Sequence, residues 1–91
     1  MTSQKNLNQA KVNEVFPGIE RVPGVSGGDP VIAQTRIPVW LLVQAHQAGV
    51  SDADLLRGYP SLRARDLANA WAYYEYHRAE IDQEIAENEN A

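Results

Sequence analysis

The sequence of 91 residues contains no cysteine and only two histidines. The absence of cysteine excludes disulfide bonds and any zinc site with thiolate ligands. Stability must therefore come from apolar packing, and a chain of this length supplies a core for one small domain. Because cysteine-free chains suit a reducing compartment, we expect a cytoplasmic protein.

Long apolar segments are missing as well. The longest apolar stretch is the five residues Val39–Val43, far short of the ~20 residues that cross a bilayer. The first residues, Met1–Asn6, are polar and lack the apolar core of a signal peptide. The sequence therefore predicts a soluble protein with no membrane partner.

Catalytic and metal-binding patterns are also absent from the sequence. His46 and His77 stand alone, without the spacing of a metalloprotease motif. Asp52 and Asp54 suit the first turn of a helix, where carboxylates are stabilised, better than an acid–base pair. No nucleophile, base and orienting group occur as a set. We therefore expect no enzymatic activity, no metal and no cofactor.

The charges are unevenly distributed along the chain, whose net charge is −4. Residues 1–74 carry seven basic and six acidic groups, whereas residues 75–91 carry one basic and six acidic groups. Two interpretations of this acidic end remain open. It is either a solvated tail or an amphipathic acidic helix, anchored by Ile81 and Ile85, that covers the basic surface of a partner.

Turn residues and hydrophobic periodicity predict the order of the elements. Ser51 is expected to cap a short helix, with Asp54 completing a weak capping box. Two short strands are not stable alone in water, so they must pack on helices or on another chain. The expected segments are a loose arm over 1–18, strands over 19–22 and 31–33 (the second continuing through 35–37), and helices over 38–48, over 52–57 and from residue 61 or 63 to 91.

The predicted last helix carries apolar and aromatic residues on more than one side. One stripe steps by four and three residues from Leu67 to Ile85, while Tyr73 and Tyr76 lie on the opposite side. Because a small domain can bury only one helix face, some of these side chains should contact a partner, in a homodimer or higher oligomer. The candidate interface residues are Trp71, Tyr73, Tyr76, Ile81 and Ile85.

Two short helices, a glycine-bearing turn and a longer helix are typical of a helix-turn-helix module. The sequence thus predicts a mainly α fold, with a three-helix core, a short N-terminal β element and a long C-terminal helix. Arg63, Arg65 and Asn69 would lie at the start of a recognition helix, where arginine can read guanine and asparagine can read adenine. The alternative is a solvated polar face.

Three motifs together resemble one known family. They are the segment GVSGGDPVIAQTRIPV at 24–39, AGVS at 48–51 and YPSL at 59–62. They are similar to domain-of-unknown-function family 433 (DUF433), a group of VapB-like antitoxins, over about residues 19–78, which leaves 79–91 as an acidic extension. The resemblance implies a homeodomain-like helix-turn-helix domain and dimerisation. It also implies a PIN-like ribonuclease toxin as the partner to be bound and neutralised, and operator DNA as a second ligand.

Some residues depart from the family pattern. Asp29 stands where the family favours lysine, and Ala33 and Gln34 stand where it favours Arg-Gly. These changes remove two cations and add an anion, which weakens any contact with phosphates. In the neighbouring block TRIP, Arg36 either contacts DNA or a partner carboxylate, or braces the corner between strand and helix through backbone carbonyls.

Three other functions therefore remain open besides that of an antitoxin. The first is a DNA-binding regulator without a toxin partner, which the basic residues at the start of the last helix favour. The second is a dimerisation or adaptor module that has lost DNA binding, which the net negative charge and Asp29 favour. A small hydrolase is the weakest alternative.

Overall fold

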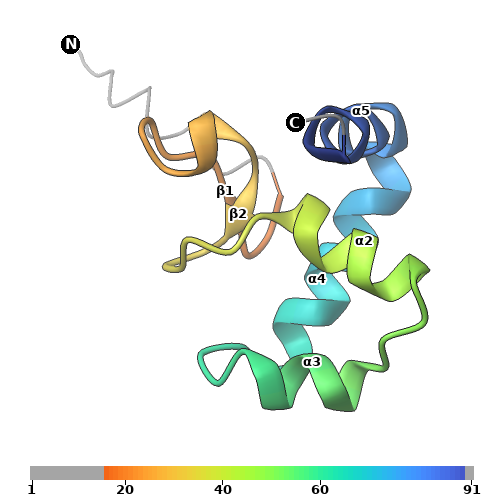
Figure 1. The fold of residues 1–91 in the computed structure, drawn as a ribbon. Coiled ribbons are helices and arrows are strands. Elements are labelled where there is room, and N and C mark those ends of the chain that lie inside the picture. The colour runs from red at the N-terminus through yellow and green to blue at the C-terminus, as the bar shows by residue number, and fades with distance from the viewer. Residues whose placement is uncertain (1–15, 90–91) are drawn as a thin grey trace, which may run out of the picture.

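The computed structural model describes residues 16–89, which form four α-helices and a two-stranded sheet (Figure 1). This arrangement confirms the predicted mainly α fold with a short N-terminal β element. Residues 1–15 of the expected arm lie outside the described residues. The elements are β1 (Ile19–Glu20), the 3-10 turn η1 (Ser26–Gly28), β2 (Val31–Ile32), α2 (Val39–Gln47), α3 (Asp52–Gly58), α4 (Ala64–Tyr76) and α5 (Arg78–Glu89).

The β element is smaller than the sequence predicts. β1 and β2 pair antiparallel, with Ile19 opposite Ile32, and both of these side chains are buried in the helical core. The expected continuation of the second strand is instead a turn, in which Gln34 adopts a left-handed φ of 63°. Strands of two residues persist here because β1 packs on α4 rather than standing free in water.

Helices α2 and α3 lie close to where the sequence predicts them. Pro38 immediately precedes α2, and Gly49 follows it with a φ of 96°, which a residue with a side chain rarely adopts. The Ser51 hydroxyl accepts a hydrogen bond from the Asp54 amide at 3.1 Å, which confirms the predicted cap. Helix α3 then ends at Gly58.

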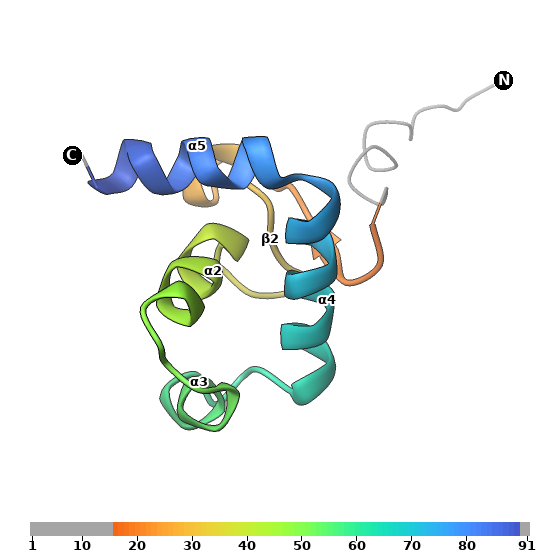
Figure 2. The same cartoon turned by 90° about the vertical axis from the view of Figure 1, so that its right-hand side faces the viewer.

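The prediction of one continuous last helix is wrong. The chain leaves helical geometry at His77, whose φ and ψ are −134° and 39°, so that α4 and α5 are separate helices. The His77 ring stacks on Tyr73 at 4.0 Å between centroids, and its Nδ1 lies 3.1 Å from the Tyr73 carbonyl oxygen. This break directs α5 across α2 (Figure 2). The segment contains neither glycine nor proline, so tertiary packing decides the break.

Because α5 packs on the core, part of the predicted partner interface is wrong. Tyr73, Ile81 and Ile85 are only 2%, 0% and 8% exposed, because they pack into the core of this same chain. Trp71 is half-buried, and Tyr76 is 79% exposed. Of the five candidate interface residues, therefore, only Trp71 and Tyr76 can reach a partner. Residues 79–89 belong to the packed domain and are not a solvated tail.

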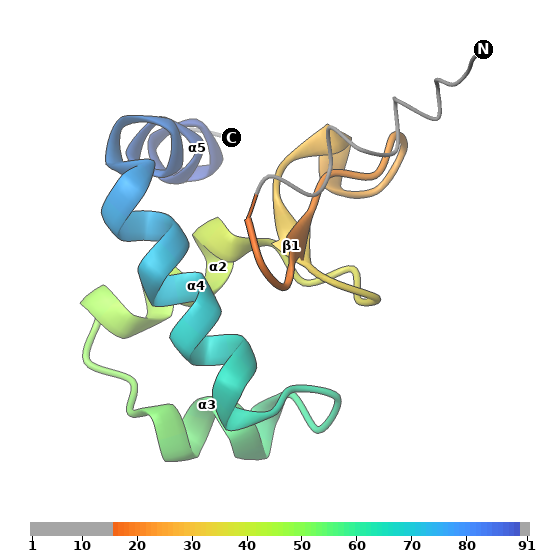
Figure 3. The ribbon, with the colours of Figure 1, turned by 180° about the vertical axis from the view of Figure 1, so that it is seen from behind.

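The arrangement of the helices separates the charged ends of the domain. Helix α3 lies beside the start of α4, whereas α5 lies at the other end of α4 (Figures 2 and 3). The arginines at the start of α4 and the carboxylates of α5 are therefore at opposite ends of the molecule. Between them lies the core, whose most completely buried side chains include Leu42, Leu67 and Ile81.

Truncation of Ile81 tests whether α5 is part of the core. Because this side chain is fully buried, Ile81→Ala should lower the free energy of unfolding by about 2–5 kcal/mol, through lost burial and the resulting cavity. Urea denaturation measures the change. Gln83→Ala, at an exposed position of the same helix, is the control and should change it by less than about 0.5 kcal/mol. Equal, small effects would show that α5 is not packed as described.

Candidate functional site

A polar hollow lies where the start of α4 meets the turn between β2 and α2. It is an open cavity of about 300 Å³. Two segments about thirty residues apart in the sequence contribute to it, so only the fold brings them together. We call it the arginine pocket; its lining residues are Ala33, Gln34, Thr35, Ser61, Arg63, Arg65 and Asp66.

The backbone around Arg63 and Arg65 is held by buried neighbours and by a helix cap. Leu62 and Leu67 on either side are buried in the core. The Asp66 carboxylate accepts the Arg63 backbone N–H at 2.8 Å, so this acidic group caps α4. Both arginines are exposed, and within residues 16–89 neither forms an ion pair. Their guanidinium groups are therefore available to an anionic ligand.

The other two predicted DNA-binding residues do not line this pocket. Asn69 is half-buried against the turn at Gly18, where an added Cβ would lie 2.4 Å from the Asn69 Nδ2. Arg36 is exposed, and its guanidinium forms no hydrogen bond or ion pair within the described residues. Of the two roles left open for Arg36, bracing the corner between strand and helix is performed by Thr35 instead. The Thr35 hydroxyl donates to the Ile32 carbonyl at 2.8 Å and accepts the Ile37 N–H at 3.0 Å.

The departures from the family pattern fall at two separate places in the fold. Ala33 and Gln34 line the arginine pocket. Because the arginine that the family favours at position 33 is absent, the pocket carries one positive charge fewer. Asp29 does not line the pocket but faces α5. Burial raises the pKa of Asp29, and the nearby Glu87 carboxylate adds to this effect. The residue at position 29 therefore affects the packing of α5 and does not contribute to the charge of the arginine pocket.

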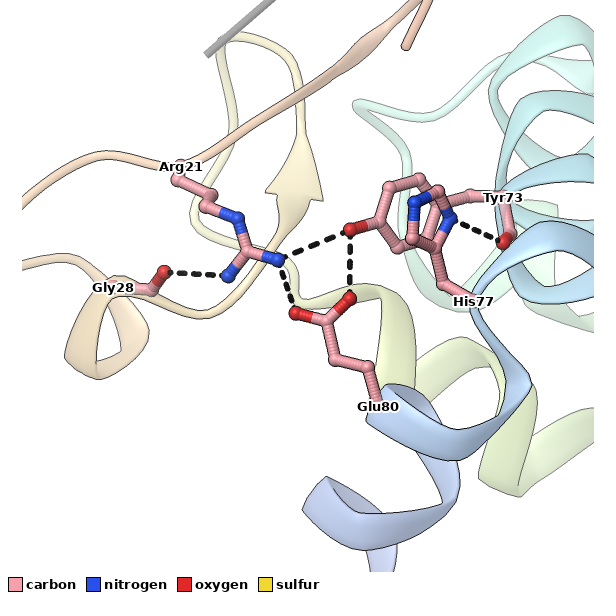
Figure 4. Close-up of polar contacts among 5 residues, drawn as sticks. All are labelled: Arg21, Gly28, Tyr73, His77 and Glu80. Carbon is pink, nitrogen blue, oxygen red and sulfur yellow. Dashed lines mark hydrogen bonds and ion pairs between the residues drawn. The ribbon is translucent and has the colours of Figure 1, made fainter. Parts of the chain in front are cut away.

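A hydrogen-bond network, which sequence reasoning missed, links the N-terminal segment to α4 and α5 (Figure 4). Arg21 forms an ion pair with Glu80 and donates to the Tyr73 hydroxyl at 3.2 Å and to the Gly28 carbonyl at 3.4 Å. The Tyr73 hydroxyl donates to Glu80 at 2.9 Å. Burial, and then Glu80, raise the pKa of Tyr73 to about 12. The hydroxyl therefore stays protonated and acts as a structural donor.

Glu84 is a buried acid in the same region. It is 7% exposed, and its Oε1 has no hydrogen-bond partner within the described residues. Its pKa is raised to about 7, first by burial and then by the charges of Asp29 and Glu80, while Arg21 opposes this rise. Among residues 16–89 no group of three or more potential ligands is placed to hold a metal ion. We therefore interpret Glu84 as an unpaired core carboxyl rather than a ligand.

Comparison with known proteins identifies the family. The family model described as "Protein of unknown function (DUF433)" matches residues 19–74, more than half of the chain. The chain belongs to DUF433. A solved DUF433 member protein from Anabaena variabilis ATCC 29413 is 45% identical, with a TM-score of 0.75, and the match covers 93% of this chain and 86% of that one. Comparison with curated proteins yields no significant match. Because this family is described as one of unknown function, membership in it does not identify an activity.

The raised pKa of Glu84 predicts how stability depends on pH. The folded pKa of about 7 exceeds the ordinary value of 4.5, so the folded chain binds more protons than the unfolded chain between these pH values. The free energy of unfolding should therefore fall as pH rises through this window. Glu84→Gln should be more stable than the unmodified protein by about 1–3 kcal/mol at pH 8, with little difference at pH 4.

Urea denaturation of both proteins at pH 4 and pH 8 measures this difference. The matched control is Glu75→Gln, at an exposed position, and its effect should stay within about 0.5 kcal/mol at either pH. If Glu84→Gln has the same effect at both pH values, the pKa of Glu84 is not raised, and if the variant is less stable at pH 8 than at pH 4 relative to the unmodified protein, Glu84 is ionised and satisfied in the fold. Either result would show that our interpretation is wrong.

Proposed function

We propose that this DUF433 protein is an antitoxin-like protein. In this proposal it binds and neutralises a PIN-like ribonuclease, and it binds its own operator DNA through the start of α4, with α2, α3 and α4 as a helix-turn-helix unit. The observation that carries the proposal is the separation of charge along α4. Arginines without an ion-pair partner among residues 16–89 lie at one end of the domain, and the carboxylates of α5 lie at the other.

The arginine pocket supports the DNA-binding part of the proposal. Arg63 and Arg65 are exposed at the first turn of α4, where helix N–H groups also favour phosphate. The 13 residues of α4 span about 20 Å at 1.5 Å per residue. Charges in physiological salt are screened over about 8 Å. The acidic α5 is therefore too far away to cancel the attraction of the arginines for DNA, despite the net charge of −4.

The acidic helix supports the nuclease-binding part. Asp82, Glu87 and Glu89 are exposed on α5, while Ile81 and Ile85 fix this helix to the core. The carboxylates are thus presented on a rigid element rather than on a fraying tail. A ribonuclease needs a basic surface for its substrate, and such a surface is complementary to this face of α5.

The nuclease-binding part predicts a stable complex. We expect the adjacent reading frame to encode a PIN-like ribonuclease. The chain should co-purify with that protein, and RNA cleavage by it should be lost at an equimolar ratio. Size-exclusion chromatography and an RNA cleavage assay before and after mixing measure the two effects. Unchanged cleavage in the presence of excess chain would leave the DNA-binding regulator or the adaptor as the better interpretation.

The DNA-binding part predicts a salt-dependent affinity for the operator of the same operon. Arg63→Ala and Arg65→Ala should each weaken binding and reduce the slope of log K against log salt by about one, because each removes a phosphate contact. Fluorescence anisotropy over a salt series measures both quantities. Arg78→Ala, which removes the same charge at the other end of α4, is the control. If all three variants bind alike, the arginine pocket is not the DNA-binding surface.

A further inference from the structure

Two surface hollows border α2 on different sides, and neither is part of the arginine pocket. The first is an open cavity of about 320 Å³ between α2 and α4, with Val43, Trp71 and Ala72 among its lining residues. The second, of about 520 Å³, lies between α2 and the end of α5 and is lined in part by Leu41 and Ala45. Gln47 borders both hollows. We call the two hollows together the α2 groove, of which they are the first and second parts.

The part of the groove next to α4 is aromatic and partly open. The His46 ring lies 4.6 Å from the Trp71 ring, and Trp71 and Tyr74 are both half-buried. Hydrogen bonds order this wall of the groove: Gln47 donates to the Tyr74 hydroxyl at 3.2 Å, and that hydroxyl donates to Asp82 at 2.7 Å. A preformed apolar hollow of this size suits a large apolar side chain from another molecule.

The rim of the groove is acidic. Glu75 lines the first part and Glu89 the second, and Asp82 adjoins the first part by accepting the hydrogen bond of the Tyr74 hydroxyl. The Glu89 carboxylate accepts a hydrogen bond from Gln44 of α2 at 3.3 Å. Arg78 is the one cation among residues 16–89 that lines the groove; it forms an ion pair with Glu75 at 3.5 Å and lies over the Tyr74 ring at 4.9 Å. The groove thus combines an apolar floor with a net negative rim.

We propose that the α2 groove receives a basic amphipathic segment of the nuclease partner. One large apolar side chain of that segment enters the hollow beside Trp71, and its lysines or arginines face Glu75, Asp82 and Glu89. This inference rests on the proposed function, for which it names the contact surface. A second copy of this chain is the alternative occupant, which the measurement of self-association below tests.

Two variants that introduce a positive charge into the groove test the proposal. Ala72→Lys fills the hollow and repels a basic partner, and Gln47→Arg adds the same charge at an exposed position where the fold tolerates it. Each should weaken binding to the purified PIN-like nuclease at least tenfold, measured by titration calorimetry. Ala53→Lys, at an exposed position of α3, is the matched control and should bind as tightly as the unmodified chain. Circular dichroism and thermal melting verify folding.

The outcomes separate the groove from the function on which it rests. If the unmodified chain binds the nuclease and Gln47→Arg binds equally well, the groove is not the contact surface, although the antitoxin proposal stands. If the unmodified chain does not bind the nuclease, both proposals fail. Affinity that does not change with salt would overturn the basic character of the occupant. Self-association that Ala72→Lys abolishes, measured by light scattering, would make a second copy the occupant instead.

Discussion

The structure depends most on the change of direction at His77. Stacking of His77 on Tyr73, and the hydrogen bonds that join Arg21, Tyr73 and Glu80, hold this corner from three segments of the chain. Because α5 turns back there, its apolar side chains pack on α2 and complete a core that the three preceding helices leave open. A continuous helix would carry Ile81 away from this core into solvent.

The same corner determines where charge lies on the surface. With α5 folded across α2, its carboxylates border the α2 groove and stand at the opposite end of α4 from Arg63 and Arg65. The two ligands that we propose, DNA and a basic protein, are opposite in charge, and the fold offers them separate surfaces of one small acidic domain. Folding α5 this way also buries Glu84 beside Asp29, so the packed interface carries an unpaired carboxyl whose pKa is raised to about 7.

Local signals in the sequence predicted the parts of the fold that depend on short-range interactions. Ser51 caps α3 through the Asp54 amide, and Gly49 takes the left-handed conformation that ends the preceding helical segment. The candidate site was only partly predictable. Arg63 and Arg65 share a pocket as residues of one exposed helix start, whereas Asn69 is drawn away from them because it packs against the distant turn at Gly18.

The sequence by itself determined the mainly helical class, the short β element, the DUF433 motifs and the concentration of acid near the C-terminus, because composition, caps and periodicity are local properties. Only the tertiary structure decided the break at His77, the burial of Tyr73 and the pairing of Arg21 with Glu80. The contacts of Arg21 with Tyr73 and Glu80 join residues more than fifty positions apart. The break, the burial and the pairing arise because burying the apolar face of α5 on α2 outweighs the helical preference of the residues at the corner.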